Sequence, residues 1–263
     1  MIFPQLKTGA LVQYPARRRS VKRTVVTTAA DGSAIKFADD NAAAVEWTLQ
    51  YEGLSADEWK ALESCFEAAE GQLRTFTFVD PLGNMLAWST DLMQSVWHRD
   101  PGLAATGGLA DPFGGTGGCR VVNGAPAAQT ISQSTAGPGS YGYTFSVYGC
   151  APSPETITLI VDSGGAARRF PVAVSGQWTR FMAHAEAVAG EGPAVFGVEL
   201  APGATVILAG PQAEAQPGAG AYLPSFSTGA VYPKTRFLED GLEVTSTAPD
   251  QYACVVRLRS AGV

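Results

Sequence analysis

One stretch of the sequence has the pattern of an amphipathic helix, and the long middle part of the chain has no comparable stretch. Ser55 precedes Glu58 by three positions, which is the spacing of a capping box at the start of a helix. Apolar residues then recur at helical spacing and form one face: Trp59, Leu62, Cys65, Phe66 and Ala69. Gly71 stands where a left-handed residue commonly ends a helix. The sequence therefore predicts one helix within residues 53–71, packed against a sheet.

Strands are predicted on both sides of this helix, because apolar and polar residues alternate there. The expected strands are residues 25–28, 34–37, 45–52 and 75–79. Asp31-Gly32-Ser33 has the composition of a hairpin turn between the first two. Asp80-Pro81 begins the turn after the last.

The middle of the chain is a series of short apolar runs between turn signals. The runs are residues 144–148, 156–161, 169–172, 177–182, 195–200 and 205–209. Short strands at this spacing are typical of a β-sandwich or jelly roll. The chain has 30 glycines and 17 prolines, which suits many turns.

The last strands, within residues 235–259, are too few to fold alone. They complete the small N-terminal sheet if the middle segment is an insertion at the Asp80-Pro81 turn. We therefore expect a discontinuous domain of residues 1–84 plus 233–263, interrupted by a jelly roll of residues 85–232. The expected fold class is mainly β with one helix.

Composition excludes several functions. The net charge of −6 argues against a general nucleic-acid binder. Four cysteines without a C-x-x-C pair, and two histidines, argue against a zinc site and favour reduced core thiols. The N-terminus lacks a signal-peptide pattern and no apolar stretch is long enough for a membrane span, so we expect synthesis in the cytosol without membrane insertion.

A basic run is the local exception to this acidic balance: Arg17, Arg18, Arg19, Lys22 and Arg23. A solvated strand edge is one interpretation, since basic residues there discourage aggregation. Contacts to an acidic neighbouring subunit or to nucleic acid are the alternatives.

No catalytic motif is present: the sequence lacks G-x-S-x-G, H-E-x-x-H, a phosphate-binding loop and G-x-G-x-x-G. We therefore expect no catalytic residues, no metal, no cofactor and no enzymatic activity. A Cys–His pair or a pair of carboxylates for glycoside hydrolysis stays open, because one sequence does not show spatial closeness.

The aromatic residues of the middle segment suggest a surface for sugar rings, whose C–H faces pack on aromatic faces. The candidates are Trp97, Tyr141, Tyr143 and Tyr222; Tyr141 and Tyr143 follow a Gly-Pro-Gly-Ser turn and are expected to be exposed. The alternative is that most of these aromatics are core residues. Asp111 and Asp162 are candidates for calcium ligands.

The ends of the chain resemble the first domain of distal tail and tail-tip proteins of long-tailed bacteriophages. The resemblance lies in Phe3-Pro4, Thr8-Gly9-Ala10, the Leu54–Gly71 helix and Phe76-Thr77-Phe78-x-Asp80-Pro81. The middle resembles the carbohydrate-binding-module-like jelly rolls that decorate such proteins. That part of the resemblance lies in residues 84–97, 143–148, 176–180 and 209–224.

This resemblance implies a tail-tube-like β fold and a structural role in the virion. It implies a ring of copies, most often six, at the end of the tail tube, with tail-tube and tail-tip proteins as partners and DNA passing through. The inserted module would adhere to host glycan. A free carbohydrate-binding module or lectin, a glycan-degrading enzyme, and a spacer that binds no sugar are the alternatives.

Overall fold

The computed structural model describes residues 1–261, and the chain forms two compact units. The first, the host unit, comprises Met1–Lys7, Val12–Phe78 and the chain from Tyr232 onward. The second, the inserted unit, comprises Thr8–Leu11 and Val79–Val231.

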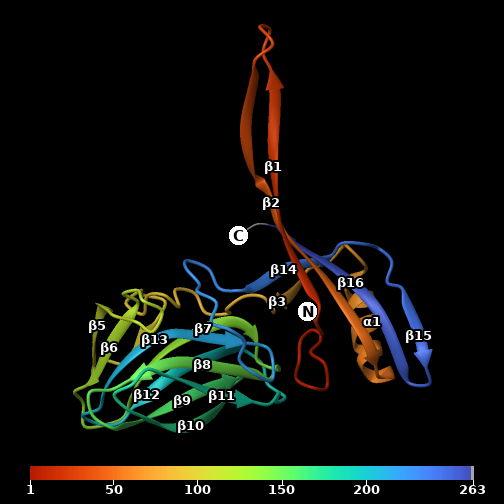
Figure 1. The fold of residues 1–263 in the computed structure, drawn as a ribbon. Helices are drawn as coiled ribbons and strands as arrows, with labels where there is room; N and C mark the ends of the chain where they lie inside the picture. The colour runs from red at the N-terminus through yellow and green to blue at the C-terminus, as the bar shows by residue number, and fades with distance from the viewer. Residues whose placement is uncertain (262–263) are drawn as a thin grey trace. The chain divides into compact units, whose positions relative to one another are not determined.

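The host unit contains a six-stranded sheet and the one helix of residues 1–261. Its elements are β1 (Ala16–Thr28), β2 (Ala34–Leu54), α1 (Ala56–Ala69), β3 (Phe76–Val79), β14 (Val231–Phe237), β15 (Val244–Ala248) and β16 (Gln251–Ala261). The strand order is β1-β2-β16-β14-β3, with β15 also paired to β16 (Figure 1). β1 is thus an edge strand, and it carries the basic run.

One face of the host sheet is buried and the other is exposed, as the period of two in β2 and β16 requires. Trp47, Leu49 and Tyr51 of β2 are almost fully buried, as are Val256 and Leu258 of β16. Aromatic rings fill this core from distant parts of the chain. Edge-on contacts join Trp47 to Phe78, Trp47 to Tyr232, and Phe66 to Phe237. The core is therefore built from both ends of the chain.

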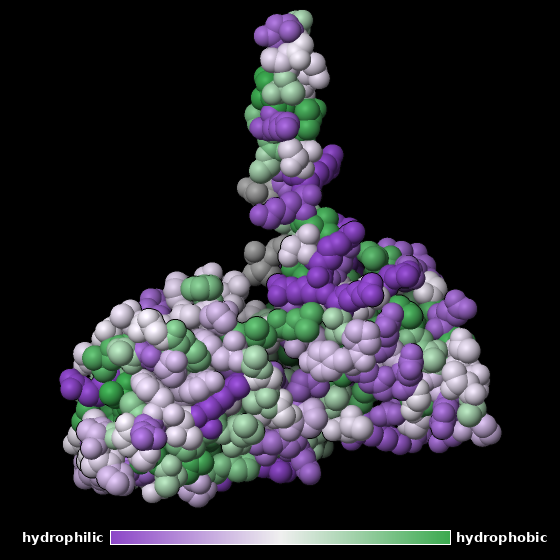
Figure 2. Space-filling view, viewed as in Figure 1, coloured by the Kyte–Doolittle hydropathy of each residue, from purple (hydrophilic) through white to green (hydrophobic). Residues whose placement is uncertain are grey.

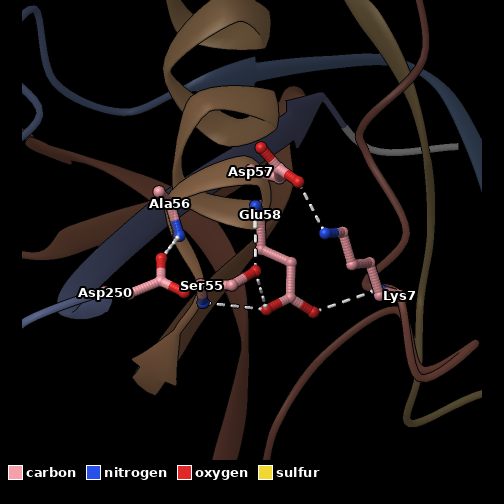
Figure 3. Close-up of polar contacts among 6 residues, drawn as sticks. All are labelled: Lys7, Ser55, Ala56, Asp57, Glu58 and Asp250. Carbon is pink, nitrogen blue, oxygen red and sulfur yellow. Dashed lines mark hydrogen bonds and ion pairs between the residues drawn. The ribbon is translucent and has the colours of Figure 1, made fainter.

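The predicted capping box is present at the start of α1 (Figure 3). Ser55 Oγ accepts a hydrogen bond from the Glu58 amide at 3.4 Å, and a Glu58 carboxylate oxygen accepts from the Ser55 amide at 3.0 Å. The Lys7 amide donates to the other Glu58 oxygen, and Asp250 accepts from the Ala56 amide at 2.7 Å. Three segments far apart in sequence therefore meet at this helix end.

The last turn of α1 ends in left-handed residues, as expected from Gly71. Both Glu70 and Gly71 have positive φ, at 51° and 61°. A Cβ at Gly71 would lie 2.6 Å from a carboxylate oxygen of Asp240, which accepts a hydrogen bond from the Gln72 amide. Glycine at this position therefore lets the 240 loop close over the helix end.

The connected ends of β1 and β2 form a two-stranded hairpin that pairs with no third strand of residues 1–261. β16 pairs with β2 from Ala44 to Leu54, so residues Lys22–Asp39 pair only within the hairpin (Figure 1). The Asp31-Gly32-Ser33 turn is confirmed: Gly32 has φ 83° and Asp31 accepts from the Ser33 amide at 2.9 Å. β2 is a single strand of 21 residues, where the sequence suggested two separate strands. We name residues 22–39 the arm.

The inserted unit is a sandwich of two antiparallel five-stranded sheets. One sheet has the order β10-β9-β12-β7-β4 and the other β11-β8-β13-β6-β5. The bounds are β4 (His98–Arg99), β5 (Leu103–Leu109), β6 (Gly118–Asn123), β7 (Gln129–Pro138), β8 (Tyr143–Cys150), β9 (Glu155–Ser163), β10 (Ala166–Val174), β11 (Thr179–Ala185), β12 (Pro193–Leu200) and β13 (Thr205–Glu214). Tyr143 and Phe145 of one sheet pack against Phe196 of the other, with ring centroids 5.4 and 6.0 Å apart.

The predicted fold class, mainly β with a β-sandwich and one helix, is confirmed. The predicted strands at residues 144–148, 156–161, 169–172, 195–200 and 205–209 lie within β8, β9, β10, β12 and β13, and the predicted strand 177–182 overlaps β11. The sequence did not predict β4 to β7, because segments such as Leu103–Leu109 are rich in glycine and alanine and have low strand propensity.

The cysteines are free thiols, and Cys65, Cys119 and Cys254 are buried. Burial raises the pKa of the Cys65 and Cys254 thiols to about 11.

The helix α1 has 14 residues. Within residues 1–261 no helix is long and apolar enough to cross a bilayer.

Replacing the capping serine tests the role of this contact. Ser55→Ala removes the acceptor for the Glu58 amide and should lower the local stability of α1 by about 1 kcal/mol. Amides of α1 should then exchange with deuterium about fivefold faster in hydrogen-exchange mass spectrometry. Ser64→Ala, on the exposed side of the same helix, is the control and should leave exchange unchanged or slower. Equal effects of both changes would contradict the capping role.

Candidate functional site

The inserted unit contains a cavity of about 410 Å³ bordered by aromatic and hydroxyl side chains. Its lining residues come from the 89–117 loops, from β13 and from the segment that follows β13. They are Ser89, Thr90, Asp111, Phe113, Gly117, Ala209, Gly210, Tyr222 and Pro224.

Two aromatic rings are stacked at this cavity. The Phe113 and Tyr222 rings lie 4.6 Å apart at an interplanar angle of 17°. Tyr148 meets Phe113 edge-on at 5.0 Å, and the Arg180 guanidinium lies 5.6 Å from the Tyr148 ring centroid. Phe113 keeps 48% of its surface exposed, so one aromatic residue at the cavity is available to a ligand.

The loop that carries Phe113 is organised by Asp111. Its carboxylate accepts hydrogen bonds from the amides of Phe113, Gly115 and Gly117, at 2.8 to 2.9 Å. Burial raises the pKa of Asp111, but these amide donors outweigh it and hold the pKa below its ordinary value. Gly114 has φ 83°, a conformation that favours glycine. The glycine-rich sequence is thus a tight loop around one ionised carboxylate.

A glycine also makes room for the stacked rings. Gly210 in β13 has φ 55°, and a Cβ there would lie 3.0 Å from the Phe113 ring and 3.2 Å from the Tyr222 ring. A larger residue would therefore displace the two rings slightly and would be strained at this positive φ.

Tyr222 is held by hydrogen bonds on both sides of its segment. Its hydroxyl lies 3.0 Å from Ser89 Oγ, which accepts from the Ser225 amide at 2.9 Å. The Leu223 amide donates to the buried Gln212 side chain at 2.6 Å. Burial is the main cause that raises the pKa of Tyr222, so this hydroxyl stays protonated at neutral pH.

A polar layer on β8, β11 and β13 supports the same segment. Arg180 donates to Ser146 Oγ at 2.9 Å and to the Gly220 carbonyl at 2.6 Å. Glu214, which is 8% exposed, accepts from the Gly220 amide and from Gln212. The chain around Gly220 is therefore fixed against the sheet, and Tyr222 with it.

Only one of the four aromatic residues proposed from the sequence lines this cavity. Tyr222 does so, whereas Trp97 is 3% exposed and its indole N–H donates to the Trp88 carbonyl. The expected exposure of Tyr141 and Tyr143 is wrong: they are 3% and 0% exposed. Tyr143 faces the sandwich core at the start of β8, and its hydroxyl donates to the Pro138 carbonyl at 2.6 Å. These three residues therefore offer no exposed ring face.

Sequence reasoning missed Phe113. The available signal was an aromatic residue inside a glycine-rich turn, where a core residue is unusual. Of the two suggested calcium ligands, Asp111 organises the loop and Asp162 accepts from the Gly165 amide at 2.9 Å. Among residues 1–261 there is no cluster of three or more residues of metal-ligating type.

The basic run lies on β1 of the host unit, and all five of its residues are exposed. Arg19 forms an ion pair with Glu46, and Arg23 with Asp39. Arg18 donates to the Tyr232 hydroxyl at 3.2 Å. These contacts hold three of the arginines in place.

The sequence matches no protein-family model, and no curated protein is significantly similar to it. Solved structures of similar fold include carbohydrate-binding modules. One is the CBM22-1–GH10 portion of the Clostridium thermocellum endo-1,4-β-D-xylanase 10B in complex with xylohexaose, with 15% identity and a TM-score of 0.40 over 53% of this chain. The chain spans 28% of that protein.

Two further structures are similar over about half of the chain. The C-terminal family 22 carbohydrate-binding module of the same xylanase has 14% identity and a TM-score of 0.43, covering 54% of this chain and all 100% of the module. Tailspike protein 4 of bacteriophage CBA120 has 10% identity and a TM-score of 0.40, covering 51% of this chain and 22% of the tailspike.

Proposed function

We propose that the inserted unit binds glycan through the cavity at Phe113 and Tyr222. The observation that carries this proposal is the stacked pair of rings beside hydroxyl and carboxylate groups. Sugar rings present apolar C–H faces and a rim of hydroxyls, so they need this combination of surfaces. The cavity volume of about 410 Å³ lies in the range of small-molecule sites.

The charge of the cavity favours neutral sugars. Asp111 is ionised at neutral pH, and a carboxylate offers about four acceptor positions, of which backbone amides occupy three. The remaining capacity suits a sugar hydroxyl and repels a carboxylate or sulfate group. We therefore expect a neutral glycan to bind more tightly than an acidic one.

Binding is tested by a glycan array followed by calorimetry on the best ligand. Phe113→Ala and Tyr222→Ala should each weaken binding about tenfold or more, because the first removes the exposed ring and the second removes the ring stacked on it. Phe226→Ala is the matched control, since Phe226 is 62% exposed and does not line the cavity. The bound glycan should not be hydrolysed, which an assay for reducing ends checks.

Three results would overturn the proposal. They are no glycan bound by the folded chain, equal losses in Phe226→Ala and Phe113→Ala, and hydrolysis of the ligand. The last would favour the glycan-degrading alternative.

A second function, assembly into a phage tail tip, is favoured by the arm. In this proposal the chain is a virion protein that is made in the cytoplasm of the infected cell. Its first compact unit, the host unit, forms a ring that joins the tail tube to the tip. An isolated two-stranded hairpin is marginally stable in water, and it leaves both edges unpaired. The arm also exposes large apolar residues: Val25, Val26, Ile35 and Phe37 are 38–56% exposed. Figure 2 shows hydrophobic residues on the surface of the arm. Such a structure gains stability when a second copy covers it, which a free lectin would not need.

The register places the apolar residues of the arm mainly on one face. Val25 lies opposite Phe37 and Thr27 opposite Ile35, so these four share a face. Val26 lies opposite Lys36 on the other face. The first of these faces is the one that a second copy would cover.

Self-association should therefore depend on that face. The double change Val25→Ser/Phe37→Ser should shift the chain toward monomer in analytical ultracentrifugation, because it removes the apolar surface that a partner buries. Val26→Ser, on the opposite face, should leave the distribution unchanged. A chain that stays monomeric at high concentration would instead support the free carbohydrate-binding module.

A further inference from the structure

The exposed face of the host sheet carries basic side chains from three strands. They are Arg17 and Arg19 of β1, Lys234 and Arg236 of β14, and Arg257 and Arg259 of β16, and all are exposed. We name these six residues the basic face. They are concentrated on one surface of a chain whose net charge is −6.

The strand register aligns these residues in rows across the sheet. In one row, Arg19 lies opposite Glu46, Glu46 opposite Arg259, and Arg259 opposite Arg236. Residues in directly opposite positions share a face, and neighbouring strands lie about 4.8 Å apart. Three arginines and one glutamate therefore form a continuous line.

A second row runs beside the first. Arg17 lies opposite Thr48, and Thr48 opposite Arg257. Positions two residues apart on a strand are separated by about 6.6 Å. The two rows together place five arginines on one face of the sheet.

The acidic residues within these rows do not cancel the positive charge. Glu46 pairs with Arg19 at 2.7 Å and with Arg259 at 3.6 Å. Its side chain is 12% exposed, whereas those of Arg19 and Arg259 are 75% and 46% exposed. Glu239 pairs with Arg257, so two acidic side chains form ion pairs with three of the six basic ones. The ion pairs orient three of the arginines, and Arg236 donates to the Gln72 and Leu73 carbonyls. The six basic residues still outnumber their two acidic partners.

The basic face has a boundary on the same side of the sheet. Glu52, Glu239 and Glu243 line a cavity of about 740 Å³ beside the second row, and Arg257 of the basic face lines the same cavity. The negative charge of these three glutamates disfavours a polyanion there, so we expect it to bind near β14 and the base of the arm. Figure 2 shows hydrophilic side chains gathered at that base.

We propose that the basic face binds the phosphate backbone of duplex DNA. Arginine forms paired hydrogen bonds with phosphate oxygens, and contacts to phosphates supply most of the affinity of sequence-independent DNA binding. Protein interfaces have an apolar centre, whereas DNA interfaces are polar and strongly positive. The two rows present arginine, threonine and glutamate, a polar and positive composition that matches a DNA interface. This inference concerns the host unit and does not depend on the proposed glycan binding.

The test is fluorescence anisotropy of a labelled duplex of mixed sequence with the full chain, over a series of NaCl concentrations. The wild type should bind without sequence preference, and a plot of log affinity against log salt should have a slope of about −4. Arg17→Gln/Arg259→Gln should make this slope less steep by about two and weaken binding about tenfold at low salt. Arg17→Gln/Lys234→Gln leaves both ion pairs of Glu46 intact and should have a similar effect.

Arg120→Gln/Arg168→Gln is the matched control, because it removes the same charge from two exposed arginines of the inserted unit. It should bind DNA like the wild type, and thermal unfolding should show that every variant is folded. An equal loss in this control, or no binding at low salt, would overturn the proposal. If the duplex does not bind but the Arg17/Arg259 change abolishes self-association, the face is a protein interface instead and the proposal is wrong.

Discussion

The pairing of β2 with β16 is the constraint on which the host unit depends. β16 is the last strand of the described chain, and it pairs with residues Ala44 to Leu54 of β2. The buried side of β16 completes the core around Trp47, and the exposed side of β16 supplies Arg257 and Arg259. Asp250, in the turn before β16, also caps the first amide of α1. Core, helix end and basic face therefore all require that both ends of the chain come together.

The inserted sequence is compatible with this constraint because its two ends are adjacent. The Asp80 amide donates to the Ala230 carbonyl at 2.9 Å, and the Ala230 amide donates to the Asn84 carbonyl at 2.8 Å. The intervening residues can form a sandwich without separating the strands that flank them. The sandwich in turn positions its candidate site on loops, where Asp111 and Gly210 determine how closely Phe113 and Tyr222 stack.

Local signals in the sequence were sufficient for part of this architecture. The capping box at Ser55 and Glu58 involves neighbouring residues, so its spacing alone predicts the helix start. The arm turn at Asp31-Gly32 is local in the same way. Strand alternation likewise located β8 and β12, but β5 has too many small residues to show a period.

The candidate site was harder to predict, because it depends on contacts between distant segments. Alternation assigns Tyr143 to one face of β8, but it does not say which face the second sheet covers. Phe113 and Tyr222 stack only because two loops converge over Gly210. The rows of the basic face also come from three strands that are separate in sequence, so the run at 17–23 revealed only one part of them.

The central claim is that the two units fold and act separately, and removal of the insertion tests it most directly. Residues 85–229 would be deleted and Asn84 joined to Ala230, whose backbones are already hydrogen-bonded. The account predicts that the shortened chain unfolds cooperatively on heating, with α1 amides as protected from hydrogen exchange as in the full chain. A shortened chain that is unfolded, without protected α1 amides, would contradict it.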